Sequence, residues 1–276
     1  MPLPEPAPES VALVTGASAG IGREFACALA KRGHGVALVA RRADRLEALA
    51  SELREKHGVR AEVVAADLAD EGVRTRLVAE LDRRGVTVNI LVNNAGFGIY
   101  SAFSASGPGR ERQQLDVLVG AVLHLDGVYL PRMLLAGGGA IINVSSTSAF
   151  QPLPGNGTYA AAKAFVLFHS EALSYEVKGT NVTVTAVCPG PVRTEFQETS
   201  DPLFTERMPR FVWTTPERVA RDGLRAAERG KRTIIPGGLG PRLFFGLNRV
   251  TPVGLSLPIA GRLMSGEVER GARPRG

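Results

Sequence analysis

The sequence predicts a single α/β domain built on a doubly wound parallel sheet. Short, nearly continuous apolar runs alternate with longer amphipathic stretches along the chain. Such runs suit strands that helices cover on both faces, and strict alternation of strand and helix requires right-handed crossovers between parallel strands. With 276 residues, 44% of them hydrophobic, the chain can bury the core of such a sheet.

Seven strands and six helices are expected, with no internal repeat and no second domain. The last helix has the clearest start, because Thr215 can cap it and Pro216 suits its first position. The expected strands are 11–15, 35–40, 61–66, 89–94, 140–146, 182–187 and 232–236, and the expected helices are 20–32, 43–57, 70–84, 109–136, 157–178 and 216–229.

Three segments are expected to differ from the regular part of the domain, which should span residues 10–240. Residues 1–9 alternate proline with acidic and small residues and are predicted to be a disordered leader. The long stretch at about 193–215 has no strong period, which predicts a substrate lid. Residues 241–276 form an apolar extension and tail whose prolines, glycines and arginines exclude a transmembrane helix. A peripheral membrane contact there is left open, although the prolines should interrupt an amphipathic helix.

The composition excludes several classes of function. A net charge of +6 favours anionic ligands, but no dense basic block predicts nucleic-acid binding. Cys27 and Cys188 are too far apart for a zinc or redox pair and suit reduced residues of a cytoplasmic protein. No metal site is expected, because metal-binding spacing is absent among the four histidines, His34, His57, His124 and His169.

The first strand leads directly into a glycine-rich turn, TGASAGIG at residues 15–22. Gly16, Gly20 and Gly22 allow a tight turn, a close approach to a phosphate and a helix that starts facing the anion. A strand–helix turn that merely needs glycine is the alternative. The position after the first strand and before an amphipathic helix favours a dinucleotide site.

The second strand ends in LVARR, where sites selective for NAD usually place an acidic residue. Arg41 and Arg42 would instead bind a 2′-phosphate through charge-assisted hydrogen bonds, although a solvated helix start is the alternative. The sequence therefore predicts NADP(H) in preference to NAD(H).

Two further strand ends carry polar residues. Asp67 in ADL can accept a hydrogen bond from the adenine amino group or cap the next helix. Asn93 and Asn94 in NNAG close the fourth strand beside the point where strand order reverses, the usual ligand crevice. They are expected to line the cofactor site rather than only to form a turn.

Tyr159 and Lys163 in YAAAK are one turn apart on one helix face. A nearby ammonium, with the positive nicotinamide of an oxidised cofactor, lowers the pKa of a phenol, so Tyr159 can exchange a proton with a substrate hydroxyl. Ser146, at the end of a strand, can hydrogen-bond a carbonyl or a developing alkoxide. The pair alone is a common coincidence, but the trio in this order is hard to explain as packing.

The glycine motif, NNAG, Ser146, YAAAK and PGPVRT at 189–194 together resemble the short-chain dehydrogenase/reductase family, from about residue 10 to 236. The resemblance implies a Rossmann sheet of seven strands in the order 3-2-1-4-5-6-7, nicotinamide-dependent oxidation or reduction, and a homodimer or homotetramer. It also implies that residues 189–194 flank the nicotinamide amide and that Lys163 reaches the nicotinamide ribose. The expected cofactor site comprises Gly16, Ser18, Gly20, Ile21, Gly22, Arg41, Arg42, Asp67, Leu68, Asn94, Ala95, Gly96, Tyr159, Lys163, Pro189, Gly190, Val192 and Thr194.

The sequence departs from this family at Leu118. Members typically place an asparagine in this part of the long helix, where it completes a Ser–Tyr–Lys–Asn tetrad and supports a local break in the helix. Here LDVLVGAVLHL, residues 115–125, has the apolar spacing of an uninterrupted helix. Leucine offers no side-chain hydrogen bond, so a proton relay from Tyr159 through Lys163 is in doubt. The main-chain carbonyl remains, and a water could be held there if the cavity is polar and roomy enough.

Apolar residues near the expected crevice favour a hydrophobic ketone or secondary alcohol (lipid-like, steroid-like or aromatic) over a small charged metabolite, with plain core packing as the alternative. The leading hypothesis is an NADP(H)-dependent oxidoreductase with Tyr159 as acid/base. The rival is a cofactor-binding, catalytically impaired protein with a sensor or assembly role, because Leu118 replaces the relay asparagine. The apolar residues are Phe97, Ile99 and Tyr100, residues 150–154, and Phe196, Phe204, Met208, Phe211 and Trp213.

Overall fold

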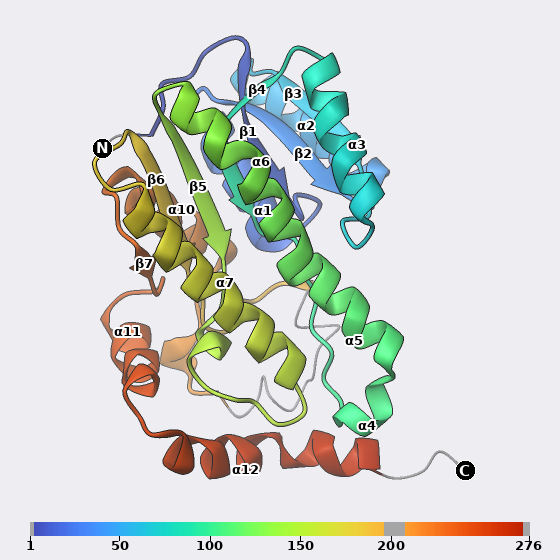
Figure 1. Ribbon diagram of the computed structural model, residues 1–276, viewed down its shortest axis with the longest axis vertical. Coiled ribbons are helices and arrows are strands. Elements are labelled where there is room, and N and C mark those ends of the chain that lie inside the picture. The colour runs from blue at the N-terminus through green and yellow to red at the C-terminus, as the bar shows by residue number, and fades with distance from the viewer. Residues whose placement is uncertain (1–2, 196–207, 273–276) are drawn as a thin grey trace.

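A seven-stranded parallel sheet forms the centre of the computed structural model, which describes residues 3–195 and 208–272, with side chains described as far as residue 262 (Figure 1). Its strand order is β3-β2-β1-β4-β5-β6-β7, so the order reverses between β1 and β4. The predicted fold class is confirmed. The strands are β1 (Ser10–Thr15), β2 (Gly35–Ala40), β3 (Ala61–Ala65), β4 (Thr87–Asn93), β5 (Gly139–Val144), β6 (Val182–Val187) and β7 (Thr233–Ile234).

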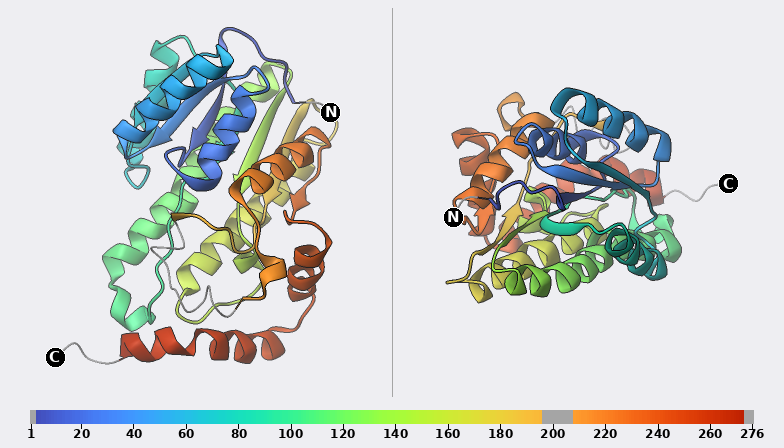
Figure 2. Two further views of the ribbon diagram at one scale, coloured as in Figure 1. Left: turned by 180° about the vertical axis from the view of Figure 1, so that it is seen from behind. Right: turned by 90° about the horizontal axis from the view of Figure 1, so that it is seen from above.

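Helices cover both faces of the sheet (Figure 2). On one face, Phe25 and Leu29 pack with Leu224 in a buried apolar cluster. On the other, Leu125 and Tyr129 pack against buried strand residues. The principal helices are α1 (Gly20–Ala30), α2 (Ala43–His57), α3 (Glu71–Arg83), α6 (Ala121–Leu135), α7 (Gly157–Glu176) and α10 (Pro216–Glu228); shorter or peripheral ones are α4 (Phe103–Ser106), α5 (Pro108–Leu115), α11 (Leu239–Gly246) and α12 (Val253–Ala272).

Two details of the predicted helices have different outcomes. The start of α10 is confirmed, because the Thr215 hydroxyl accepts a hydrogen bond from the Arg218 N–H at 3.3 Å. The continuous helix over 109–136 is wrong at its centre. A π-helical segment, η1 (Asp116–Gly120), separates α5 from α6 and contains Leu118.

A buried arginine contacts the start of this break. Arg74 is 6% exposed, and its guanidinium Nη1 donates to the main-chain carbonyls of Leu68 at 2.7 Å and Asp116 at 3.3 Å. The Asp116 carbonyl also accepts a hydrogen bond from the main-chain N–H of Ala121, five residues further on, as in a π-helix. Arg74 from α3 therefore adds a second donor to this carbonyl, and the break forms without a polar side chain at Leu118.

Predictions for the chain ends need correction. Residues 3–9, predicted to be disordered, lie against the domain, since Leu3 is 8% exposed and joins a core cluster. The C-terminal extension forms α11 and α12, and α12 continues through Pro258 rather than being interrupted there. Of the predicted lid at 193–215, residues 196–207 lie outside the described part of the chain.

Within the described residues, the stretch Pro108–Leu135 is long and apolar enough to span a bilayer, judged by length and composition alone. It contains the π-helical break, and its buried residues Leu125, Tyr129 and Met133 pack in the core beside the sheet. These contacts are those of a core helix, so the length criterion carries little weight here.

Candidate active site

A cavity of about 450 Å³ opens at the carboxyl ends of the central strands. It collects residues from the glycine-rich turn, the end of β2, the end of β4, the segment after β5 and helix α7. Gly22 and Leu118 do not line it, although both were predicted as site residues. The predicted residues that do line it are Gly16, Ser18, Gly20, Ile21, Arg41, Arg42, Asp67, Leu68, Asn94, Ala95, Gly96, Ser146, Tyr159, Lys163, Pro189, Gly190, Val192 and Thr194.

The glycine-rich turn is shaped for close approach by a ligand. Gly16 and Gly20 have φ values of 67° and 55°, which side chains rarely adopt. A Cβ at Gly22 would lie 2.5 Å from the amide nitrogen of Asn94, so Gly22 acts behind the cavity wall. Helix α1 begins here with Ala19 at its N-cap and no acidic residue in its first turn. Its N-terminal N–H groups can therefore face an anion.

Asn94 joins this turn to the end of β4. Its side-chain amide donates to the Thr15 carbonyl at 3.0 Å, while its main-chain N–H donates to the Thr15 hydroxyl at 2.9 Å. Asn93 does not line the cavity, contrary to prediction. Its amide is buried and donates to Asp126 and Asn143, at 2.8 and 2.9 Å, so the residue joins strands and helix in the core.

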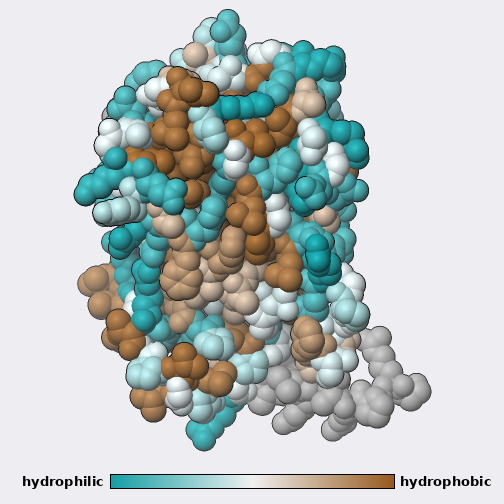
Figure 3. All heavy atoms as spheres, viewed as in Figure 1, coloured by the Kyte–Doolittle hydropathy of each residue, from teal (hydrophilic) through white to brown (hydrophobic). Residues whose placement is uncertain are grey.

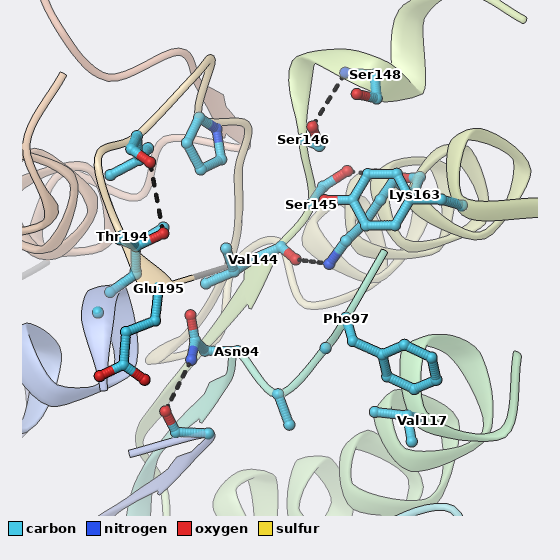
Figure 4. Close-up of a pocket in the computed structure, with 18 of the residues that line it drawn as sticks. Asn94, Phe97, Val117, Val144, Ser145, Ser146, Ser148, Lys163, Thr194 and Glu195 are labelled. Carbon is cyan, nitrogen blue, oxygen red and sulfur yellow. Dashed lines mark hydrogen bonds between the residues drawn. The ribbon is translucent and has the colours of Figure 1, made fainter. Parts of the chain in front are cut away.

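The end of β2 presents arginines to the cavity, and one of them has an internal carboxylate partner. Arg42 Nη2 donates to the Ser18 hydroxyl at 3.0 Å, and Arg42 Nη1 lies 3.0 Å from the Glu195 carboxylate. Arg45 Nη1 lies 2.6 Å from the same carboxylate. Hydrogen bonds from Arg45 and Arg42 hold the pKa of Glu195 below its usual value. The sequence reasoning missed Glu195, which lines the cavity beside Thr194 (Figure 4).

Asp67 lines the cavity, and the alternative that it caps the next helix is wrong. The N-cap of α3 is Asp70, whose carboxylate accepts from the Val73 N–H at 2.8 Å. Asp67 instead accepts from the Ala69 N–H at 3.1 Å, a local turn contact that leaves the residue at the cavity wall.

Ser146, Tyr159 and Lys163 meet in the cavity from two elements. Ser146 follows β5, accepts from the Ser148 N–H at 3.1 Å and hydrogen-bonds to Tyr159. Lys163 Nζ donates to the main-chain carbonyl of Val144 at 2.7 Å and lies 5.7 Å from the centroid of the Tyr159 ring (Figure 4). The strand end and one face of α7 therefore bring a hydroxyl, a phenol and an amine together.

Burial governs the protonation of this trio in the chain without a bound ligand. Burial raises the pKa of the Tyr159 phenol, Tyr100 adds to the rise, and the hydrogen bond from Ser146 opposes it. Burial also lowers the pKa of the Lys163 ammonium to about 8. The sequence reasoning expected the lysine to lower the phenol pKa with an oxidised cofactor present. In the chain alone the desolvation cost is larger, and Tyr159 is a neutral phenol at neutral pH.

Leu118 packs directly behind the trio. Its side chain is 1% exposed and forms a small cluster with Tyr159 and Ala162. A Cβ built on Gly96 would lie 2.7 Å from Leu118 Cδ2 and 3.9 Å from Lys163 Nζ. The leucine therefore occupies apolar space beside the lysine and leaves Gly96 as a residue without room for a side chain.

The apolar part of the cavity agrees only partly with the prediction. Phe97 and Val117 lie next to each other in its wall (Figure 4), and Phe245 and Ala260 bring the C-terminal segment into the lining. The sequence reasoning missed Val117, Phe245, Asn248 and Ala260, since nothing local connects them to the motifs. Predicted residues that line the cavity are Phe97, Tyr100, Gln151, Leu153 and Met208; Ile99, Phe150, Phe211 and Trp213 do not, and Phe196 and Phe204 lie outside the described residues.

Among the described residues, no group of three or more histidine, cysteine, aspartate or glutamate side chains could hold a metal ion.

Comparison with known proteins gives one family. The profile described as short chain dehydrogenase matches residues 10–202. A very-long-chain 3-oxoacyl-CoA reductase from Anas platyrhynchos is 34% identical over 203 residues, covering 72% of this chain and 64% of that protein, so the match spans a little under two thirds of the relative.

Two solved structures extend the likeness to almost the whole chain. A short-chain dehydrogenase from Sphingobium yanoikuyae in complex with NADPH is 30% identical, with a TM-score of 0.77 and 97% of each chain covered. A 7beta-hydroxysteroid dehydrogenase is 25% identical, with a TM-score of 0.83, covering 95% of this chain and 100% of that one.

Proposed function

Because this chain belongs to the short-chain dehydrogenase family, we propose that it is an oxidoreductase that uses NADP(H) to interconvert a hydrophobic ketone and its secondary alcohol. The observation that carries the proposal is the meeting of Ser146, Tyr159 and Lys163 in one cavity with the glycine-rich turn. Apolar packing alone does not explain a buried amine and a buried phenol that line one cavity with a hydroxyl hydrogen-bonded to the phenol.

The residues present fit a dinucleotide phosphate. The close approach at Gly16 and Gly20 and the uncapped start of α1 suit a pyrophosphate, and Arg41 and Arg42 suit a 2′-phosphate. NADP(H), when bound, would supply or accept the hydride. The NADPH complex of the Sphingobium relative supports this assignment.

Tyr159 is the proposed general acid and base. Its neutral phenol can donate a proton to a carbonyl oxygen as that oxygen gains negative charge, and the Ser146 hydroxyl can hydrogen-bond the same oxygen. Lys163 is held by the Val144 carbonyl, and its charge stabilises the phenolate left after proton transfer. Because the cavity is shaped by Phe97, Val117 and Phe245, a hydrophobic substrate fits it better than a small charged one. The substrates in the names of the acyl-CoA and hydroxysteroid relatives support this class.

A second candidate is a cofactor-binding protein with little catalytic activity. Leu118 favours it, because an apolar side chain beside Lys163 offers no hydrogen bond for a proton relay. This alternative predicts normal NADPH binding and negligible turnover of every carbonyl tested.

The proposal also includes a homodimer or homotetramer in the cytoplasm. An exposed apolar surface supports self-association, because such surfaces on soluble chains usually mark interaction sites. It is formed on α6 and α7 by Leu123, Leu134, Leu135, Phe165, Phe168 and Tyr175.

The test combines cofactor titration with a panel of hydrophobic ketones. NADPH at a hundredfold over its Kd should stabilise the fold by about 2.7 kcal/mol. Tyr159→Phe should keep NADPH binding and lower kcat by about 10²–10⁴-fold. Failure of both NADPH and NADH to stabilise the chain would refute the cofactor assignment, and full turnover by Tyr159→Phe would refute the role of the phenol.

Cofactor preference is tested separately. Arg41→Asp should lower the ratio of kcat/KM with NADPH to kcat/KM with NADH by about tenfold, because a charge-assisted hydrogen bond is lost. Arg229→Asp, at an exposed arginine outside the cavity, is the matched control and should leave the ratio unchanged. An unchanged ratio in Arg41→Asp would contradict the assignment of this residue.

A further inference from the structure

The C-terminal segment 239–262 carries an exposed apolar face that the proposed reaction does not use. Figure 3 shows apolar residues gathered at the lower left of the molecule, over α11 and α12. The face is formed by Leu239, Leu243, Leu247, Val250, Val253, Leu255, Leu257 and Ile259, whose exposed fractions run from 39% to 77%. Large contiguous apolar surfaces mark interaction sites, whereas isolated apolar residues do not.

Over residues 253–262, where its side chains are described, α12 has the reverse orientation of an ordinary amphipathic helix. The buried residues of this part are the small Ser256 and Ala260, at 5% and 2% exposure. Its large residues Leu255 and Ile259 are turned outward, at 64% and 60%. A helix that packed only against its own domain would bury the large side chains, since these gain most from leaving water.

A second stripe continues this face along α11. Leu239, Leu243 and Leu247 follow one another at a spacing of four, which places them on one side of a helical turn. The opposite side of the same segment carries Pro241 and Phe245, which are buried. Leu239 and Leu243 of α11, with Leu247 in the short helical turn after it, therefore add to the exposed apolar surface of the C-terminal segment.

The charges in this segment have one sign. Between Arg229 and Arg262 the sequence contains no aspartate or glutamate, whereas Arg242, Arg249 and Arg262 lie within the apolar stretch. Glu171, from α7, pairs with Arg249 at 2.9 Å. The Nε of Arg242 donates to the Ile235 carbonyl at 3.2 Å, and the exposed guanidinium keeps its positive charge. An apolar face with arginines and no acidic residue is complementary to an anionic lipid surface.

From these observations we propose that residues 239–262 dock on the surface of a bilayer that contains anionic lipids. The outer apolar side chains enter the interfacial region, and Arg242 contacts the headgroups. The segment is proposed to lie on the surface rather than to span the bilayer, because Phe245 of α11 and Ala260 of α12 are buried against the domain.

Docking would place lipid against the outer side of the cavity wall. Phe245 and Ala260, on the inner side of α11 and α12, line the cavity. A hydrophobic substrate dissolved in the bilayer would then be separated from the cavity by this segment alone. That substrate route rests on the proposed function, whereas lipid docking does not and is tested without substrate or turnover.

The experiment is flotation of the full chain with vesicles of phosphatidylcholine alone or mixed with phosphatidylserine. The chain should bind the anionic vesicles and lose binding as salt is raised. Leu243→Ser with Leu255→Ser should weaken binding by roughly tenfold or more, because two large side chains no longer enter the bilayer. Arg242→Gln should weaken it by about fivefold, the equivalent of one surface arginine.

Leu115→Ser is the matched control. Leu115 is 38% exposed, ends α5 outside both the C-terminal segment and the apolar surface on α6 and α7, and its replacement should leave vesicle binding unchanged. Circular dichroism and NADPH affinity should be unchanged in all variants, which separates loss of docking from loss of folding. Absence of binding to both kinds of vesicle would overturn the proposal. So would a dimer in solution that Leu243→Ser with Leu255→Ser dissociates, because that result would assign the face to a second copy of the chain.

Discussion

Replacing Leu118 by asparagine separates the packing role of this position from its effect on proton transfer. Leu118 is 1% exposed and contacts the apolar cluster that includes Tyr159. Losing a fully buried leucine costs about 1.5–3 kcal/mol, and burying an amide without a partner adds about 1–3 kcal/mol. We therefore expect Leu118→Asn to lower the free energy of unfolding by about 3 kcal/mol if the amide finds a water or main-chain partner, and by more if it does not.

The same substitution should raise kcat. An amide beside Lys163 can hold a water that connects the amine to solvent, and the π-helical break needed to reach it already exists. We expect a rise of roughly tenfold, well below the 10²–10⁴ that a complete general acid contributes. The Kd for NADPH should change little, because Leu118 does not line the cavity.

The assay measures urea unfolding, NADPH binding and kcat on one good ketone substrate for three proteins. Leu118→Ala is the control, because it removes the bulk without adding a hydrogen-bonding group and should cost about 2–5 kcal/mol. The reasoning is refuted if Leu118→Asn folds and binds NADPH normally but gains no rate. It is also refuted if Leu118→Ala gains as much, since bulk rather than polarity would then be the cause.

Three further predictions follow from buried or paired charges. Burial lowers the pKa of Lys163 from its ordinary 10.5 to about 8, so the cost of burying its charge is fully present below about pH 8 and is lost as pH rises toward 10.5. In urea unfolding at about pH 7.5, Lys163→Met should therefore have a higher free energy of unfolding than the unmodified chain. The difference between the two proteins should be about 2 kcal/mol smaller at about pH 9.5. A difference that does not change with pH would contradict the lowered pKa of Lys163. Asp126→Asn should lower the free energy of unfolding by about 3 kcal/mol, because the 2%-exposed carboxylate accepts hydrogen bonds from both Asn93 and Asn143. An unchanged free energy of unfolding would show that the two amides find other acceptors. Measured by calorimetry, Glu195→Gln should lower the Kd for NADPH a few-fold and leave the Kd for NADH unchanged, because the Glu195 carboxylate competes with the 2′-phosphate for Arg42. Equal changes in both Kd values would argue against this competition.

Some features of the candidate site follow from residues that are close together in the sequence, and others do not. The spacing of Tyr159 and Lys163 predicts a shared helix face, and the glycines of TGASAGIG predict a tight turn before a helix; the structure places both at one cavity. In contrast, the pairing of Arg42 with Glu195 joins residues far apart in the chain, and no local pattern indicates it. The same is true of Phe245 and Ala260 in the cavity wall.

The segment around Leu118 shows the limit of periodicity. Apolar spacing from 115 to 125 is compatible with an unbroken helix, yet η1 interrupts it at Asp116–Gly120, where buried Arg74 from α3 contacts the Asp116 carbonyl. Asn93 was expected to line the cofactor site because it ends a strand. Its amide instead binds the Asp126 carboxylate, which comes from a helix distant in the sequence.

The sequence by itself determined the alternation of strands and helices, the parallel sheet and the residues that meet at its carboxyl edge. These follow from burial on one or both faces and from chain geometry, which repeat over a few residues. Only the tertiary structure decided the break at Leu118, the internal partner of Arg42, the protonation of Tyr159 and Lys163 and the outward face of α12. Each of these four features depends on removal of a group from water or on a partner from a distant segment. Residues adjacent in the chain set neither of these two conditions.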